Sequence, residues 1–151
     1  MLISTSKSKL EICRKIASVL ARAIPQAVYF GRGKRSIECL AKHATKRRFE
    51  RLCIVSPYKI YFFGLNNSKV EAVGELSIKK ALLVLRPKLP AAGSLRFCGQ
   101  KSNLVHKLFG RIVCSEGESY CISATSKRFC LKKGRQKLLE LEVDYGQKSC
   151  I

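Results

Sequence analysis

Residues 1–56 read MLISTSKSKLEICRKIASVLARAIPQAVYFGRGKRSIECLAKHATKRRFERLCIVS and alternate short apolar segments with amphipathic ones. Three of the apolar segments, residues 1–5, 27–30 and 52–56, have the length of buried strands. The last one is hydrophobic throughout, which is typical of a central strand covered on both faces. Apolar residues recur at helical spacing between the strands. The order strand, helix, strand, helix, strand predicts an α/β layer.

Both segments between these strands carry helix signals. Ser8 and Glu11 fit a capping box, which predicts a first helix that begins after Ser8 and is ended by Pro25. Ser36 is the predicted cap of the second helix, and the basic run at residues 46–48 follows its apolar face.

The rest of the chain is richer in strands. Residues 60–63 and 70–78 predict strands, the second through regular alternation of apolar and polar side chains. Two prolines and a glycine in residues 86–93 predict a linker. Further strands are predicted at residues 94–98, 120–124, 129–131 and 138–145, with a short helix capped by Ser102. The two halves, about 1–86 and 94–151, both open with a strand, a Lys/Ser segment and an amphipathic helix, which indicates an internal duplication within one domain.

Charge is the most informative feature of the composition. Thirty Lys and Arg against ten Asp and Glu give a formal net charge of +20 in 151 residues. Residues 1–51 alone carry 13 basic and 3 acidic side chains, or +10. Such a surplus repels itself, and nucleic acid is its usual partner because lysine and arginine release counterions from phosphates. A solubilising surface without a partner is the alternative, but the charges cluster beside helix starts and turns.

Two loops between a strand and a helix have the character of phosphate-binding sites. Residues 4–9 place several hydroxyls and two lysines before the first helix, and residues 31–35 place two glycines and three cations before the second. Glycine lets a ligand approach the backbone, and a helix start offers free N–H groups. If the first two strands are parallel neighbours, both loops meet at the carboxyl edge of the sheet, where ligands bind. The alternative is a pair of tight turns with solvated basic side chains.

Patterns for catalysis or metal binding are poor. The chain has two histidines, neither in a nucleophile motif, and its ten acidic residues are scattered. We therefore expect no enzyme activity, no cofactor and no metal. The eight cysteines form no C-x-x-C pair. They are expected to act as small hydrophobic core residues, the alternative being one or two disulfides.

No apolar run approaches the roughly 20 residues that a bilayer span needs. Met1 leads directly into an apolar segment without the charged leader and cleavage site of a signal peptide. We therefore expect a cytoplasmic protein with no membrane partner. Its aromatic residues Tyr29, Phe30, Tyr58 and those at 61–63 have two interpretations, core packing or stacking on unpaired bases.

Thr5, Ser6 and Lys7 end the first predicted strand, and an Arg-Gly loop follows the second. The matched positions of this loop are Arg32, Gly33, Ser36, Ile37 and Leu40. In order and spacing, these motifs resemble the start of the archaeal Brix-domain family. The resemblance implies an α/β fold of two similar halves with mixed sheets, each resembling the anticodon-binding domain of class IIa aminoacyl-tRNA synthetases. It also implies a non-catalytic factor of pre-rRNA processing and ribosomal subunit assembly, with rRNA or pre-rRNA and other assembly proteins as partners.

The loops and the resemblance together predict an RNA-binding surface. Its members are Thr5, Ser6, Lys7, Lys9, Arg32, Gly33, Lys34 and Arg35. Residues predicted to contact flanking phosphates are Lys46, Arg47, Arg48, Lys132, Lys133 and Arg135. Two alternatives remain open: a tRNA- or ribosome-binding protein of the anticodon-binding type, and a basic module that binds an acidic protein.

Overall fold

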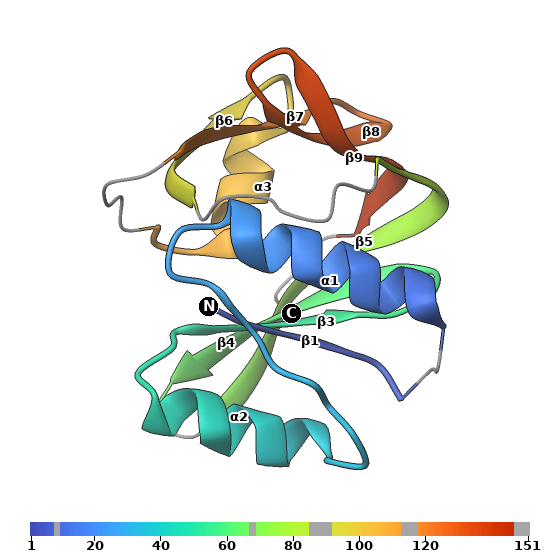
Figure 1. Cartoon of the computed structure of the whole chain (residues 1–151). Coiled ribbons are helices and arrows are strands. Elements are labelled where there is room, and N and C mark those ends of the chain that lie inside the picture. Colours follow the sequence, from blue (N-terminus) through green and yellow to red (C-terminus); the bar gives the residue numbers. More distant parts are fainter. Residues whose placement is uncertain (8–9, 67–68, 85–91, 113–117, 147–151) are drawn as a thin grey trace.

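The computed structural model describes residues 1–7, 10–66, 69–84, 92–112 and 118–146. These residues form a mixed α/β fold with nine strands and three helices (Figure 1). The elements are β1 (Leu2–Thr5), α1 (Glu11–Ala23), β2 (Val28–Tyr29), α2 (Ile37–Lys46), β3 (Arg51–Val55), β4 (Lys59–Asn66), β5 (Lys69–Leu83), β6 (Ala92–Cys98), α3 (Ser102–Phe109), β7 (Glu118–Ala124), β8 (Arg128–Lys133) and β9 (Gln136–Gly146).

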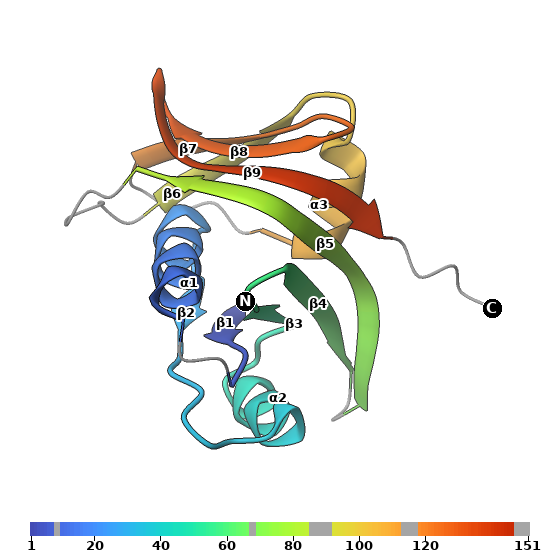
Figure 2. The same cartoon turned by 90° about the vertical axis from the view of Figure 1, so that its right-hand side faces the viewer.

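All nine strands belong to one sheet, in the order β2-β1-β3-β4-β5-β9-β8-β7-β6. Strand β1 pairs in parallel with β2 and β3, β6 pairs in parallel with β7, and the other pairs are antiparallel. The long strands β5 and β9 pair at the middle of the sheet, and the sheet curls along them (Figure 2). They join two arms, one that ends in β4, β3, β1 and β2 and one that ends in β8, β7 and β6. The halves were predicted to have sheets of their own, whereas the structure has a single continuous sheet. The predicted linker lies mostly outside the described residues, and β6 begins at Ala92.

Helix α1 fills the inside of the curled sheet. It contacts β1 and β3 in one arm and β6 and β9 in the other (Figure 2). Its buried residues are Cys13, Ile16, Ala17, Leu20 and Ala23. The helix begins at Glu11, later than the capping box predicted, and Leu10 precedes it without a side-chain cap. Glu11 forms an ion pair with Lys15 one turn on, with Nζ and Oε1 2.7 Å apart; Ser8 lies outside the described residues.

Helix α2 covers the other face of the same strands. The Ser36 hydroxyl accepts a hydrogen bond from the Cys39 backbone N–H at 3.2 Å, so the predicted cap is confirmed. Its buried residues pack with Leu2, Leu52 and Ile54 in a second hydrophobic cluster. Strand β3 is thus buried on both faces, as its sequence predicted.

Three of the six described cysteines are buried, as the prediction of apolar core residues requires, and three are not. Cys13, Cys53 and Cys130 are buried, and burial raises the pKa of the Cys53 thiol. Cys98 and Cys121 lie on neighbouring strands with their sulfur atoms 3.3 Å apart, within hydrogen-bonding distance. No disulfide joins cysteines within the described ranges, while Cys114 and Cys150 lie outside them.

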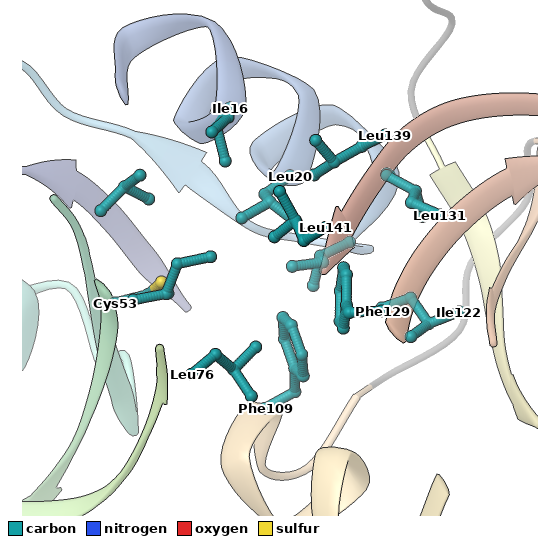
Figure 3. Close-up of a cluster of buried hydrophobic side chains, with 14 of the residues drawn as sticks. Ile16, Leu20, Cys53, Leu76, Phe109, Ile122, Phe129, Leu131, Leu139 and Leu141 are labelled. Atoms are coloured by element: carbon teal, nitrogen blue, oxygen red, sulfur yellow. The ribbon is translucent and has the colours of Figure 1, made fainter. Parts of the chain in front are cut away.

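Phe109, at the end of α3, sits where the cores of the two arms meet (Figure 3). Its ring centroid lies 5.1 Å from that of Phe62 in β4 and 6.1 Å from that of Phe129 in β8. The surrounding cluster takes in α1 through Leu20 and the far arm through Leu141. One aromatic side chain therefore links packing across both ends of the sheet.

We expect Phe109→Ala to lower the free energy of unfolding by about 3–5 kcal/mol, because a large aromatic ring leaves a cavity that the rigid sheet cannot fill. Urea unfolding followed by circular dichroism measures the loss. Leu104→Ala, at a half-buried position of the same helix, is the control and should cost much less. Equal losses in the two variants would contradict the central place assigned to Phe109.

Candidate nucleic-acid interface

The two predicted phosphate loops meet at one edge of the sheet. Strands β1 and β2 are parallel neighbours, with Leu2 opposite Val28 and Ile3 opposite Tyr29. Their carboxyl ends therefore open on the same side, as the sequence predicted. A groove of about 700 Å³ lies there. This rim groove is lined by Thr5, Ser6, Lys7, Arg14, Tyr29, Gly31, Arg32, Gly33 and Lys34.

Buried hydroxyls and backbone bonds hold the two loops in register. The Ser4 hydroxyl donates to the Phe30 carbonyl at 2.7 Å, and the Phe30 N–H donates to the Ile3 carbonyl at 2.8 Å. On the other side, the Ser6 N–H donates to the Val55 carbonyl at 2.8 Å. Ser4 and Thr5 are both buried. Polar residues at the end of β1 and just after it thus anchor the groove, and Thr5 and Ser6 also line it.

The Arg-Gly loop is a turn that presents its side chains in two directions. Gly33 has a φ of +56°, a left-handed conformation that favours glycine. The turn is closed by Arg35, whose N–H donates to the Arg32 carbonyl at 3.1 Å, while the Arg32 Nε donates to the Arg35 carbonyl at 2.9 Å. The Arg35 guanidinium lies over the Phe30 ring, 5.2 Å from its centroid. Arg32 and Lys34 line the rim groove, and Arg35 does not.

The cations of the groove keep their charge available. No ion pair joins Lys7, Arg32 or Lys34 to an acidic side chain within the described part of the chain. The nearest acids are occupied elsewhere: a hydrogen bond from Lys15 lowers the pKa of Glu11. Hydrogen bonds from its own backbone N–H and from Ser36 lower the pKa of Glu38, with a smaller contribution from Arg32.

The remaining predicted residues do not join this groove. Lys46 is the last residue of α2, and Arg47 and Arg48 follow it, at the amino edge of β1 and β3 and thus opposite the rim groove (Figure 1). Lys132, Lys133 and Arg135 lie at the β8–β9 turn, in the other arm of the sheet. Lys9 lies outside the described residues. The 13 predicted residues that the structure describes are thus divided among three regions of the surface.

Three basic residues that line the rim groove or a second pocket were not predicted by the sequence analysis. Arg14 lines the rim groove from α1, one turn beyond the predicted loop. Arg51 and Arg111 join Arg47 and Arg48 in a pocket of about 390 Å³ at the amino edge. The other residues lining this arginine pocket are Met1, Ile24, Pro25, Gln26, Phe49, Glu50, Phe109 and Ile112. Helical periodicity indicates the position of Arg14, but no local signal links Arg51 with Arg111.

Other kinds of site find little support. Among the described residues, no three His, Cys, Asp or Glu side chains are grouped so that they could hold a metal ion. A search of the same residues for a helix long and apolar enough to cross a bilayer found none.

A mixed α/β sheet with basic grooves at both ends of its parallel strands is suited to binding a polyanion. The same fold occurs in a probable ribosomal biogenesis protein from Aeropyrum pernix K1, with a TM-score of 0.76, 16% sequence identity and coverage of 98% of this chain and 96% of that one. Mil, an archaeal Imp4-like protein, matches with a TM-score of 0.70, 18% identity and coverage of 97% and 99%. The predicted resemblance to the archaeal Brix-domain family is thereby confirmed for the fold. Searches with protein-family models and among curated protein sequences gave no match.

We expect Ser4→Ala to lower the free energy of unfolding by about 1–3 kcal/mol, because it leaves the Phe30 carbonyl without its partner in a partly buried position. Thermal unfolding measures the change. Ser126→Ala, at an exposed position, is the control and should have almost no effect. A Ser4→Ala variant as stable as the control would contradict the anchoring role of this hydroxyl.

Proposed function

We propose that the protein binds rRNA or precursor rRNA and acts as a non-catalytic factor in ribosomal subunit assembly in the cytoplasm. The observation that carries this proposal is the rim groove, where hydroxyls and cations from two loops converge at the carboxyl edge of parallel strands, and no described acid forms an ion pair with Lys7, Arg32 or Lys34. The fold shared with a protein named for ribosomal biogenesis supports the same role.

The groove has the chemistry that an RNA backbone needs. Lys7, Arg32 and Lys34 supply positive charge, and the Thr5 and Ser6 side chains add hydroxyls at the base of the groove. Contacts to phosphate and sugar give affinity without reading sequence. Counterion release from the phosphates would then drive binding of a chain with a net charge of +20.

The arrangement of the strands supports the idea of one domain built from two related halves. Strands β6, β7, β8 and β9 pair with one another in the same order and directions as β1, β3, β4 and β5. In each set a helix follows the first strand: α1 follows β1, and α3 follows β6. This repetition agrees with an internal duplication, and the likeness of each half to an anticodon-binding domain is part of our proposal.

The identity of the bound RNA is tested by crosslinking the full chain to RNA in its native cell extract and sequencing the crosslinked fragments. Precursor rRNA fragments clustered at one site are the expected result. Mature tRNA would favour the anticodon-binding alternative. Binding to an acidic protein that survives nuclease treatment, with no crosslinked RNA, would overturn the proposal.

We expect the double variant Arg32→Ala/Lys34→Ala to weaken RNA binding by a few kcal/mol at most, at roughly 1.5–3 kcal/mol for each lost hydrogen bond to a charged group. The slope of log affinity against log salt concentration should also fall by about two, because two phosphate contacts are lost. Fluorescence anisotropy with labelled rRNA fragments over a salt series measures both quantities.

The matched control is Lys101→Ala/Lys107→Ala, which removes the same charge from exposed positions at α3. It should reduce affinity far less than the groove variant. Equal losses in the two variants would mean that overall charge, and not the rim groove, determines binding.

A further inference from the structure

The arginine pocket at the amino edge concentrates positive charge that the fold itself does not neutralise. Arg47, Arg48, Arg51 and Arg111 line it, against one carboxylate, Glu50. Among the described residues, no ion pair joins Glu50 to any of these arginines. Four guanidinium groups around a recess of about 390 Å³ repel one another unless an anion lies between them.

Arg51 gives a second indication that the pocket receives an anion. Its Nε is buried and has no hydrogen-bond partner within the described residues, while its NH1 donates only to the neighbouring Glu50 carbonyl at 3.3 Å. The side chain is held in place by Gly110, where a Cβ would lie 2.9 Å from the Arg51 Cγ. Arg51 is thus a fixed cation at the wall of the pocket with no ion pair to any described carboxylate, and its charge favours an anion in the pocket.

Strand β2 connects this pocket directly with the rim groove. The arginine pocket is lined by Pro25 and Gln26 just before the strand, and the rim groove by Tyr29 and Gly31 at its end. From Gln26 to Gly31 is five residue steps, which span at most about 16 Å at roughly 3.3 Å each. This length corresponds to roughly five or fewer stacked nucleotides of one strand.

The path between the two sites is open. Strand β2 is the edge of the sheet, and Val28 and Tyr29 are 37% and 36% exposed. The N–H groups of Val28 and Phe30 bond to β1, so the amide of the intervening Tyr29 faces the open edge. Tyr29 also lines the rim groove, and an aromatic side chain beside cationic residues is an arrangement with which proteins hold unpaired bases.

We propose that a single RNA strand lies along the β2 edge, with phosphates in the rim groove and in the arginine pocket and a base stacked on Tyr29. This inference rests on the proposed function and adds to it the form of the RNA, an unpaired segment of several nucleotides. A duplex is disfavoured because its paired bases are not free to stack on Tyr29.

The test uses the full chain and labelled single-stranded oligoribonucleotides of 3 to 12 nucleotides, with anisotropy read at fixed salt. Affinity should rise steeply once the oligonucleotide is long enough to reach both sites. In the Arg47→Ala/Arg111→Ala variant this rise should be lost, with binding of a 10-nucleotide strand weakened about tenfold or more. Both arginines line the pocket and lie outside the hydrophobic core, so the fold should be unaffected.

Tyr29 supplies an independent measurement. Tyr29→Ala should weaken binding of the 10-nucleotide strand by roughly tenfold or more, and Tyr29→Phe, which keeps the ring, should bind like the unchanged protein. Lys101→Ala/Lys107→Ala is again the control for charge. Circular dichroism and thermal unfolding of every variant verify the fold.

The outcomes separate this inference from the proposed function. If the rim variant Arg32→Ala/Lys34→Ala loses affinity but the pocket and Tyr29→Ala variants do not, the β2 path is wrong while RNA binding at the rim stands. Tighter binding of a 12-base-pair duplex that is indifferent to Tyr29→Ala would likewise overturn the single-strand path. If no oligonucleotide distinguishes any variant from the unchanged protein, both proposals fail.

Discussion

Burial of α1 inside the curled sheet is the constraint on which the rest of the structure depends. Helix α1 contacts strands of both arms, and its apolar stripe is too wide to be covered by one face of a flat sheet. Its residues Ile16 and Leu20 are buried among side chains from both arms. The sheet buries this apolar stripe by curling around the helix, and the long β5–β9 pair connects the two arms along the curve. Because α1 follows β1 after only a short loop, its position also fixes where the polar residues after β1 emerge.

This packing also determines where the parallel strands β2, β1 and β3 can present the candidate interface. Hydrophobic clusters on both faces of β1 leave only the strand ends and the β2 edge for ligands. The acids of the chain are used elsewhere: Glu75 pairs with Lys59, Asp144 with Lys79, and Glu140 with Lys137. These exposed pairs contribute little to stability. They do, however, engage acids away from β2, and Glu50 is the one carboxylate that lines either cationic site among the described residues.

Local patterns predicted more of this site than of the sheet that carries it. The Ser36 cap and the meeting of the two loops follow from turn chemistry and parallel pairing, and both are present. The predicted start of α1 was wrong: the helix begins at Glu11, and Leu10 precedes it without a side-chain cap. The single sheet was missed because the pairing of β5 with β9 joins segments more than fifty residues apart and leaves no mark in either segment alone.

The arginine pocket could not be predicted from the sequence for the same reason, because its side chains come from positions far apart in the chain. Arg51 and Arg111 meet because Gly110, with a φ of +75° and no Cβ, lets the end of α3 approach the start of β3. The cations of the resulting pocket and of the rim groove lie at opposite ends of β2, so screening with a Debye length of roughly 8 Å at physiological salt weakens their repulsion. The two cationic sites therefore repel each other only weakly. A strand that reaches both binds them as linked sites, so that the second contact adds affinity through its high effective concentration. If RNA binds as proposed, dividing the charge between the two ends of the edge strand would give avidity for a polyanion at a smaller electrostatic cost to the fold than one continuous patch would impose.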